Sequence, residues 1–193
     1  VSTMQKQSHL AGLGVEATFA PIGWSEDLGE DRRGERDLDA VFLGTVRPGL
    51  RRARVLERLR EQLAAKGVEL TIVSGDCFGE KRTALLNRAK VMVHIHQYPW
   101  DTPWLRFVIA MSCGAMVVSE RLADARPFVP GEHFAQGEVD ALAQVVHDFI
   151  LDAAAREAVV AAAGRFVTDE LTTAESLRKI MSVLTPGRVG MVG

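Results

Sequence analysis

Residues 91–120, VMVHIHQYPWDTPWLRFVIAMSCGAMVVSE, decide the fold because they predict a strand, a short loop, a helix and a second strand with little chain between them. The run 91–96 is apolar and β-branched, which is typical of a strand buried on both faces of a parallel sheet. After the loop 97–103, apolar residues recur at helical spacing until Gly114, a residue type that commonly ends helices. Residues 115–119 form the second strand, so the stretch predicts a βαβ unit.

The loop between this strand and its helix is the first candidate for a functional site. Asp101 or Thr102 can cap the helix by accepting a hydrogen bond from a backbone N–H group, and Pro103 suits the first helical position. In open parallel sheets, ligands bind beyond the carboxyl ends of the strands. We therefore expect residues 94–102 to lie at a binding site.

The composition is that of an ordinary globular protein. The chain has 193 residues, of which 47% are hydrophobic and 25% charged, enough for one good core. Its net charge of −2 gives no general attraction for nucleic acid or an anionic membrane, and no apolar stretch is long enough to span a bilayer. Cys77 and Cys113 lack the spacing of a zinc site and are expected to be reduced packing residues. Because no signal-peptide pattern is visible either, we expect a cytoplasmic protein.

The chain divides into a short opening segment, a connector and one domain. Residues 1–24 predict a helix at 4–13 and a strand at 15–20, which we interpret as the remnant of a preceding domain. Residues 25–38 are charged and contain glycine, so they are expected to be a linker. The rest of the chain is expected to form one domain at 39–185 and a flexible tail at 186–193.

Strands and helices are predicted in strict alternation within this domain. The helices carry stripes of Ala, Val and Leu, and the connections are short. This order predicts an α/β fold, a doubly wound parallel sheet of Rossmann type with flanking helices and a C-terminal helical stretch. Besides the βαβ unit, the expected strands are 40–46, 68–74 and a short edge strand at 133–136, and the expected helices are 50–66, 80–90, 138–151, 152–165 and 169–184.

A glycine-bearing turn crowded with arginine follows the first expected strand. In the segment GTVRPGLRRAR, residues 44–54, the glycines have P-loop spacing, but Leu50 and Arg51 stand where Lys and Ser or Thr are needed. The GxGxxG fingerprint of dinucleotide-binding proteins is absent too. Arg51 and Arg52 have no acidic residue three or four positions on, and cations oppose the dipole at a helix N-terminus. An anionic ligand such as a phosphate would explain why Arg47 and the arginines near it gather at the start of a helix. The alternative is that they form a basic surface exposed to solvent.

Two further strand ends carry candidate site residues. The loop SGDCFGE, residues 74–80, contains Gly75 and could approach a ligand through its backbone, although such a sequence is more often a plain turn. His94 and His96 alternate onto one face, where they could donate to a phosphate, bind a metal or be satisfied buried residues. A metal is the weakest alternative, because no ligand follows at familiar spacing apart from Asp101. No Ser/His/Asp grouping or close carboxylate pair is legible, so the catalytic residues stay unassigned.

Three segments resemble a known family. LLNRAKVMVHIH (85–96), IAMSCGAMVVSE (109–120) and VPGEHF (129–134), followed by Ala-rich helices, are similar to the carboxy-terminal domain of GT-B fold glycosyltransferases. The likeness is greatest to the glycosyl transferases group 1 branch that includes spore-maturation-type proteins. It extends over roughly the whole expected domain.

The resemblance implies two Rossmann-like domains with a cleft between them. The second domain, to which this chain corresponds, binds a nucleoside-diphosphate sugar, and an N-terminal domain supplies most contacts to the acceptor, here an unknown glycan, lipid or small molecule. Such enzymes are generally metal-independent, because helix N-termini and basic side chains neutralise the leaving diphosphate. The implied function is a glycosyltransferase of hexosyltransferase type, or its donor-binding half, with no metal and no cofactor besides the sugar nucleotide.

The resemblance also implies a set of donor-binding positions. Arg47, Arg51 and Arg52 lie on the segment that contacts phosphates in the family, and residues 75–79 lie near the base. Together with the strand-end residues above, the candidate donor-binding residues are Gly44, Thr45, Arg47, Arg51, Arg52, Gly75, His96, Asp101 and Thr102.

One motif departs from the family pattern. Many relatives have a Glu-x7-Glu pair around the third loop, and its second Glu holds the ribose. In this chain Asp101 and Ile109 occupy those positions, and Ile109 cannot hydrogen-bond to a hydroxyl group. A non-catalytic interaction module that has kept the fold and lost the donor chemistry is therefore the alternative function.

Overall fold

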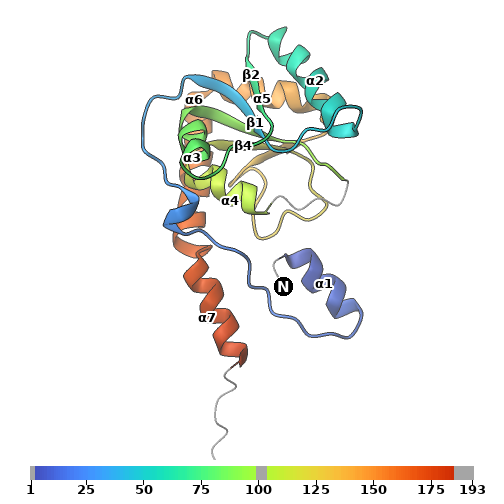
Figure 1. Ribbon diagram of the computed structural model, residues 1–193, viewed down its shortest axis with the longest axis vertical. Coiled ribbons are helices and arrows are strands. Elements are labelled where there is room, and N and C mark those ends of the chain that lie inside the picture. Colours follow the sequence, from blue (N-terminus) through green and yellow to red (C-terminus); the bar gives the residue numbers. More distant parts are fainter. Residues whose placement is uncertain (1–2, 99–103, 185–193) are drawn as a thin grey trace, which may run out of the picture.

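A single parallel sheet lies at the centre of the computed structural model, which describes residues 3–98 and 104–184. Its five strands are hydrogen-bonded in the order β2-β1-β3-β4-β5, and the sheet lies in the upper part of the molecule in Figure 1. All neighbouring strands run parallel, and Val91 of the central strand is aligned with Ala40 on one side and Met116 on the other. The strands are β1 (Leu38–Leu43), β2 (Leu70–Val73), β3 (Ala89–His94), β4 (Met116–Glu120) and β5 (Ala135–Gly137). This arrangement confirms the predicted Rossmann-like α/β fold.

The strand order places a topological switch between β1 and β3. From β1 the chain crosses to β2 on one side, then returns past β1 to form β3, β4 and β5 on the other. At such a switch the connections leave in opposite directions, which opens a crevice beyond the carboxyl ends of the two strands. The fold therefore favours a ligand site beyond β1 and β3.

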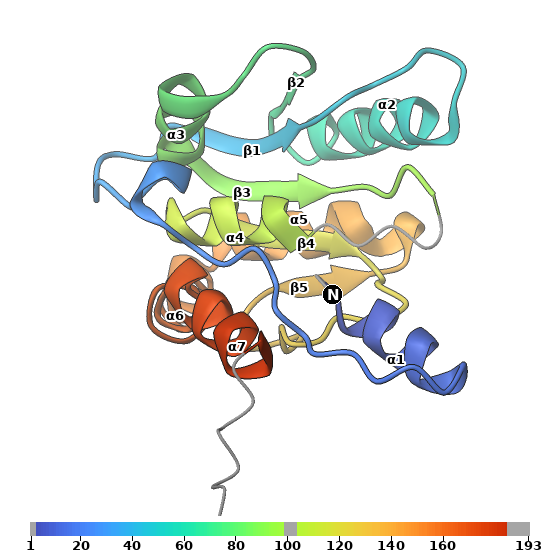
Figure 2. The same cartoon turned by 60° about the horizontal axis from the view of Figure 1, so that its bottom comes forward.

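Helices cover both faces of the sheet. The α-helices of the described residues are α1 (Met4–Gly12), α2 (Arg51–Ala64), α3 (Gly79–Arg88), α4 (Trp104–Ser112), α5 (Leu142–Leu151), α6 (Ala153–Arg165) and α7 (Thr173–Leu184), of which α2 to α5 supply side chains to the cores beside the sheet. The core on one face includes side chains of α3 and α4, and the core on the other includes those of α2 and α5. Figure 2 shows α4 in front of the strands and α5 behind them. Apolar spacing explains this packing, because Leu56, Leu59 and Leu63 share one side of α2 and are all buried.

The stretch that predicts the βαβ unit forms the middle of the core. Val91, Met92 and Val93 are fully buried, as expected for a strand covered on both faces. The whole of β4 is buried as well. Gly114 has a φ of +71° two residues after the last residue of α4, which confirms that this helix ends where the sequence predicts.

Two predicted elements differ in the structure. Residues 15–20 are extended but belong to no strand ladder within 3–98 and 104–184, so the predicted strand is not formed. A strand requires a neighbouring strand to satisfy its backbone groups, and the sheet of this domain lies elsewhere. The helix predicted before that segment is confirmed as α1. The predicted helix 169–184 is confirmed as α7, but it begins later, at Thr173, after a π-helical segment at Phe166–Glu170.

The connector at residues 25–38 is fastened to the domain by an arginine. Arg36 donates to the backbone oxygens of Leu86 over 3.0 Å, Ala89 over 2.8 Å and Cys113 over 2.9 Å. These carbonyl groups lie at the ends of α3 and α4, where helices favour cations. The connector therefore follows the surface of the domain although its composition is that of a linker.

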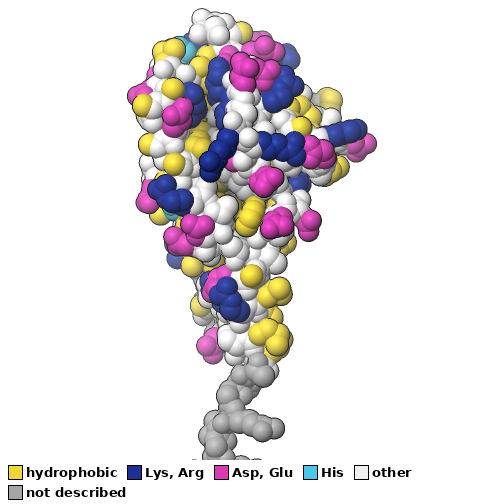
Figure 3. All heavy atoms as spheres, turned by 90° about the vertical axis from the view of Figure 1, so that its left-hand side faces the viewer, with side chains coloured by type: hydrophobic (Ala, Val, Ile, Leu, Met, Phe, Trp, Pro, Cys, Tyr) yellow, Lys and Arg dark blue, Asp and Glu magenta, His cyan; other side chains and the backbone are white. Residues whose placement is uncertain are grey.

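Two helices extend from the layered body. In Figure 1, α1 and α7 lie below the sheet and its covering helices. Figure 3 shows apolar side chains gathered next to the grey end of the chain. The exposed apolar residues of α7 are Leu177, Ile180, Met181, Val183 and Leu184. Several of them recur at helical spacing, so α7 presents an apolar stripe to solvent. None of the helices in the described ranges is both long and apolar enough to traverse a bilayer.

Candidate functional site

A pocket of about 380 Å³ opens at the topological switch, beyond β1 and between α3 and α4. This volume is typical of small-molecule sites. Its apolar walls include Leu43, Leu86, Met92 and Ile109. Its polar lining comes from glycine-bearing turns and from two guanidinium groups, at Gly44, Thr45, Gly75, Arg82 and Arg106. The pocket therefore combines a largely apolar interior with a cationic edge.

Arg106 brings a positive charge from α4 to this pocket. Its Nη1 donates to Nδ1 of His94 over 2.9 Å. A Cβ atom at Gly44 would lie 3.3 Å from Nη2 of Arg106, so the guanidinium passes close over the first residue after β1. Gly44 also has a φ of +151°, which residues with side chains rarely adopt. Glycine at this position thus permits both the turn and the approach of Arg106.

His94 is fully buried at the end of β3. Because arginine can only donate, Nδ1 of His94 accepts and the neutral ring carries its proton on Nε2. Burial is the main cause that lowers the pKa of His94 well below its usual value, and the charges of Arg106, His96 and Arg52 lower it further. His94 is therefore a neutral acceptor for Arg106 at ordinary pH.

His96 lies on the same face as His94 and bonds to a different part of the chain. The two ring centroids are 5.2 Å apart, with the rings at 79° to each other. Nε2 of His96 donates to the backbone oxygen of Arg121 over 3.0 Å. The other ring nitrogens, Nε2 of His94 and Nδ1 of His96, are buried and have no hydrogen-bond partner within the described residues. Those residues also include no group of three or more His, Cys, Asp or Glu side chains placed to hold a metal ion.

Two of the predicted phosphate-binding arginines, Arg51 and Arg52, approach from α2 on the opposite face and bond to the protein. Both terminal nitrogens of Arg51 donate to the carboxylate of Glu120. Arg52 is buried and donates to the backbone oxygens of Ile95 over 2.9 Å and Thr45 over 3.1 Å. Arg51 has no acidic residue at helical spacing, as the sequence shows, but it pairs with an acidic residue from a distant part of the chain. The partner lies 69 residues further along the chain, where helix spacing cannot reveal it.

The structure brings part of the predicted site together. Gly44, Thr45 and Gly75 all line the pocket. Arg47 is exposed in the turn before α2. Asp101 and Thr102 lie outside the described residues, and the remaining predicted residues are the paired or buried side chains described above.

Among the charged and aromatic side chains of the pocket, Arg82 and Arg106 were not predicted from the sequence, and Phe78 was included only through the segment 75–79. Phe78 is 71% exposed, so it presents a bare aromatic ring beside the pocket. Arg82 reaches in from α3, and its Nη2 donates to the backbone oxygen of Leu28 over 3.0 Å. A signal was available for Arg106, which is the only charged residue in the otherwise apolar helix Trp104–Ser112. A charged side chain requires polar surroundings, and in this fold these lie at the carboxyl ends of the strands.

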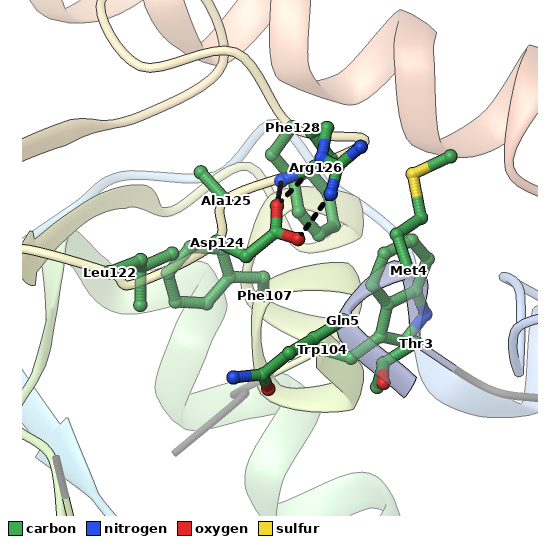
Figure 4. Close-up of a pocket in the computed structure, with 10 residues that line it drawn as sticks. All are labelled: Thr3, Met4, Gln5, Trp104, Phe107, Leu122, Asp124, Ala125, Arg126 and Phe128. Atoms are coloured by element: carbon green, nitrogen blue, oxygen red, sulfur yellow. Dashed lines mark hydrogen bonds and ion pairs between the residues drawn. The ribbon is translucent and has the colours of Figure 1, made fainter. Parts of the chain in front are cut away.

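A second cavity lies beside α1 and is too small for a nucleotide. Figure 4 shows it between Met4 on one side and the rings of Phe107 and Phe128 on the other. Its volume is about 20 Å³, close to that of one water molecule. The two charged residues that line it, Arg126 and Asp124, bond to each other, because Nη2 of Arg126 donates to Oδ2 of Asp124 over 2.7 Å. This cavity marks where α1 meets the domain, and the switch-point pocket is the stronger candidate site.

The strand order defines a Rossmann-like α/β domain, with a pocket at its topological switch. The chain belongs to the Glycosyl transferase-like family, whose characteristic sequence pattern matches residues 51–182. No curated protein matches the chain by sequence.

Solved structures of glycosyltransferases share the fold of nearly the whole chain. TarM from S. aureus, in a complex that includes UDP, has a TM-score of 0.73 at 11% identity, over 95% of this chain and 43% of TarM. HepE from Anabaena, with UDP and glucose, has a TM-score of 0.70 at 14% identity, over 97% of this chain and 62% of HepE. WaaG, a glycosyltransferase involved in lipopolysaccharide biosynthesis, has a TM-score of 0.66 at 13% identity, with coverage of 97% and 62%.

These comparisons confirm the resemblance at the level of family and fold. The identities are low, so the structural likeness shows a shared fold and carries no substrate with it. The chain spans less than half of the length of TarM and less than two thirds of HepE and WaaG.

Proposed function

We propose that this chain is the donor-binding half of a glycosyltransferase, which holds a nucleoside-diphosphate sugar while the sugar passes to an acceptor. The observation that carries the proposal is the switch-point pocket, where Arg82 and Arg106 stand beside glycine turns and apolar walls. The solved structures of HepE and TarM with UDP support a ligand of this class. Family membership supports the reaction class.

The two sides of the pocket suit the two ends of a nucleoside diphosphate. At the end of β1, the turn at Gly44 and Thr45 lets the guanidinium of Arg106 lie close to the backbone, and guanidinium forks match phosphate oxygens. At the end of β2, the loop that contains Gly75 and Phe78 offers an exposed ring on which a base can stack. We therefore place the diphosphate near Arg106 and the base near Phe78.

The proposed transfer is a substitution at the anomeric carbon of the sugar. The bond from this carbon to the phosphate oxygen breaks, the acceptor oxygen forms a new bond to it, and the acceptor's proton passes to a base. Negative charge builds up on the leaving diphosphate, and fixed guanidinium and N–H groups stabilise that charge. In this proposal the chain's own groups neutralise the diphosphate, so no metal is required.

An acceptor-binding domain packed against α1 and α7 is part of the proposal. The apolar stripe of α7 is exposed, and so are Leu13, Val15 and Ile22 around the extended segment. Exposed apolar surface of this kind favours a protein contact. An extended segment can also add a strand to the sheet of another domain. The base that receives the acceptor's proton is assigned to that domain.

Calorimetric titration of the chain with UDP, GDP, ADP and TDP tests the proposal. We expect saturable binding of at least one of them, and Arg106→Met should weaken it about tenfold or more, because a charge-assisted hydrogen bond is lost. Arg60→Met removes the same charge from an exposed position on α2 and is the matched control, with affinity expected within about twofold. Absence of saturable binding for all four nucleotides would overturn the proposal. A chain that binds a protein partner but none of the nucleotides would support the alternative function, a non-catalytic interaction module.

A further inference from the structure

We propose that His94 is a positioning residue that holds the guanidinium of Arg106 over the turn at Gly44. This inference rests on the proposed function, because the position of Arg106 matters to binding when an anionic part of the donor meets it. It also explains why a histidine stands at the buried end of β3, between the core and the pocket.

The hydrogen bond between Arg106 and His94 can run in only one direction. Nη1 of Arg106 lies 2.9 Å from Nδ1 of His94. A guanidinium has no acceptor atom, so Arg106 donates and His94 must present an unprotonated Nδ1. On the other side, Nη2 of Arg106 lies 3.3 Å from the place that a Cβ at Gly44 would occupy. Arg106 is thus confined between the imidazole and the β1 turn.

His94 is held in place by its own surroundings. Its ring meets Phe107 edge-on, with 5.7 Å between centroids, and meets His96 in the same way at 5.2 Å. Its backbone is aligned with Ser119 in the ladder between β3 and β4. A side chain packed between two rings on a central strand has a fixed rotamer. The acceptor offered to Arg106 therefore has a fixed position.

The charges around His94 preserve this acceptor. Arg106, His96 and Arg52 all disfavour a proton on the ring, and burial does so most strongly, which keeps the pKa of His94 well below its usual value. An imidazolium would present N–H groups to Arg106 and repel it. The bond from Arg106 to His94 is therefore maintained across the neutral pH range.

A guanidinium that is already positioned binds an anion more tightly. Arginine has a long side chain that loses rotamer freedom when a ligand orders it. His94 removes part of that freedom before the ligand arrives, which is preorganisation in the usual sense. We therefore expect the loss of the His94 acceptor to weaken nucleotide binding about tenfold, although His94 is not among the residues that line the pocket.

Substitutions at position 94 can separate the acceptor from the bulk of the ring. His94→Asn keeps an acceptor oxygen near the position of Nδ1, whereas His94→Leu keeps much of the volume and has no acceptor. The probes are the nucleotide that binds the wild-type chain most tightly and inorganic pyrophosphate. We expect His94→Leu to weaken both about tenfold and His94→Asn to stay within about threefold of wild type. Urea unfolding shows whether each variant is folded, and His94→Gln, with its acceptor shifted outward, replaces His94→Leu if the latter is not.

A double-mutant cycle distinguishes positioning from general structural damage. In an Arg106→Met background, His94→Leu should cause no further loss of affinity, because its effect passes through the arginine. An additive loss would overturn the positioning role, and so would wild-type affinity in the His94→Leu single variant. Both of those results leave the proposed function standing. A wild-type chain that binds neither a nucleotide nor pyrophosphate would overturn both proposals.

Discussion

Arg51 and Glu120 form a two-pronged ion pair across the carboxyl edge of the sheet, although 69 residues separate them in the chain. Nη1 of Arg51 donates to Oε2 of Glu120 over 3.1 Å, and Nη2 donates to Oε1. Glu120 also accepts the backbone N–H of His96 over 3.1 Å. The carboxylate is nearly buried and requires such donors. Arg51 therefore belongs to the framework that joins α2 to the end of β4.

Arg51→Met should reduce stability more than ligand affinity. The substitution leaves Glu120 largely buried without its counter-charge, so we expect the free energy of unfolding, measured in urea, to fall by about 1–3 kcal/mol. Nucleotide affinity measured by calorimetry should stay within about twofold. Arg58→Met removes a charge from an exposed ion pair on the same helix and should change stability by less than about 1 kcal/mol. A tenfold loss of affinity at unchanged stability would instead assign Arg51 to the phosphates.

This ion pair shows which features a sequence can and cannot predict. Periodicity and turn residues are local, so the βαβ unit at 91–120 and the alternation of strands and helices follow from the sequence. The partner of Arg51 depends on which strand ends lie together in space, and no local pattern contains that information. For Arg106 the lone charge in an apolar helix was visible, but its place beside Gly44 depends on how α4 packs against the sheet.

The segments before the domain show the same limit. Residues 15–20 have the composition of a strand, yet no strand pairs with them in the part of the chain that the structure describes. Residues 25–38 have the composition of a linker, yet Arg36 fastens them to two helices. Composition sets what a segment is able to form, and tertiary contacts decide which of these forms it takes.

Arg36→Met should destabilise the domain by about 2–4 kcal/mol. Its guanidinium donates to three backbone carbonyls at the ends of α3 and α4, and these groups would lose a charged donor. Urea unfolding measures the change. Arg33→Met alters an exposed residue of the same connector and should leave stability within about 0.5 kcal/mol. Equal stability of the two variants would show that the connector is as loose as its composition predicts.

Because residue 109 is isoleucine, the pocket should bind a nucleotide about equally well with and without one hydroxyl of its ribose. Ile109 lines the pocket, and it stands at the position that the family resemblance assigns to the second Glu of the Glu-x7-Glu pair, but its side chain cannot hydrogen-bond. We expect UDP and its 2′-deoxy analogue to bind with affinities within about threefold, and Ile109→Gln to increase the preference for UDP. Competition binding of the two nucleotides measures the ratio. If the wild-type chain binds UDP more than about tenfold more tightly than the 2′-deoxy analogue, another group of the protein hydrogen-bonds to this hydroxyl.

Two buried histidines should make the domain less stable as the pH falls below neutrality. Burial is the largest cause that lowers the pKa of both His94 and His133. In the unfolded chain each titrates near about 6.5, so below that pH the unfolded state binds protons that the folded state excludes. The free energy of unfolding should then fall by up to about 1.4 kcal/mol per pH unit for each histidine. Urea unfolding between about pH 7 and 5 should show a smaller slope for His94→Asn, and an unchanged slope would contradict this assignment.

The two cysteines should report directly on ligand binding. Cys77 is partly exposed and lines the switch-point pocket, whereas Cys113 is buried, and burial raises the pKa of the Cys113 thiol. Only a thiolate that reagents can reach reacts, so Ellman's reagent should modify Cys77 quickly and Cys113 only after unfolding. A nucleotide bound in the pocket should slow the fast reaction in proportion to its occupancy, and Cys77→Ser should abolish the fast reaction. If a nucleotide binds by calorimetry and the rate at Cys77 does not change, the ligand occupies another part of the chain and the proposed donor site is wrong.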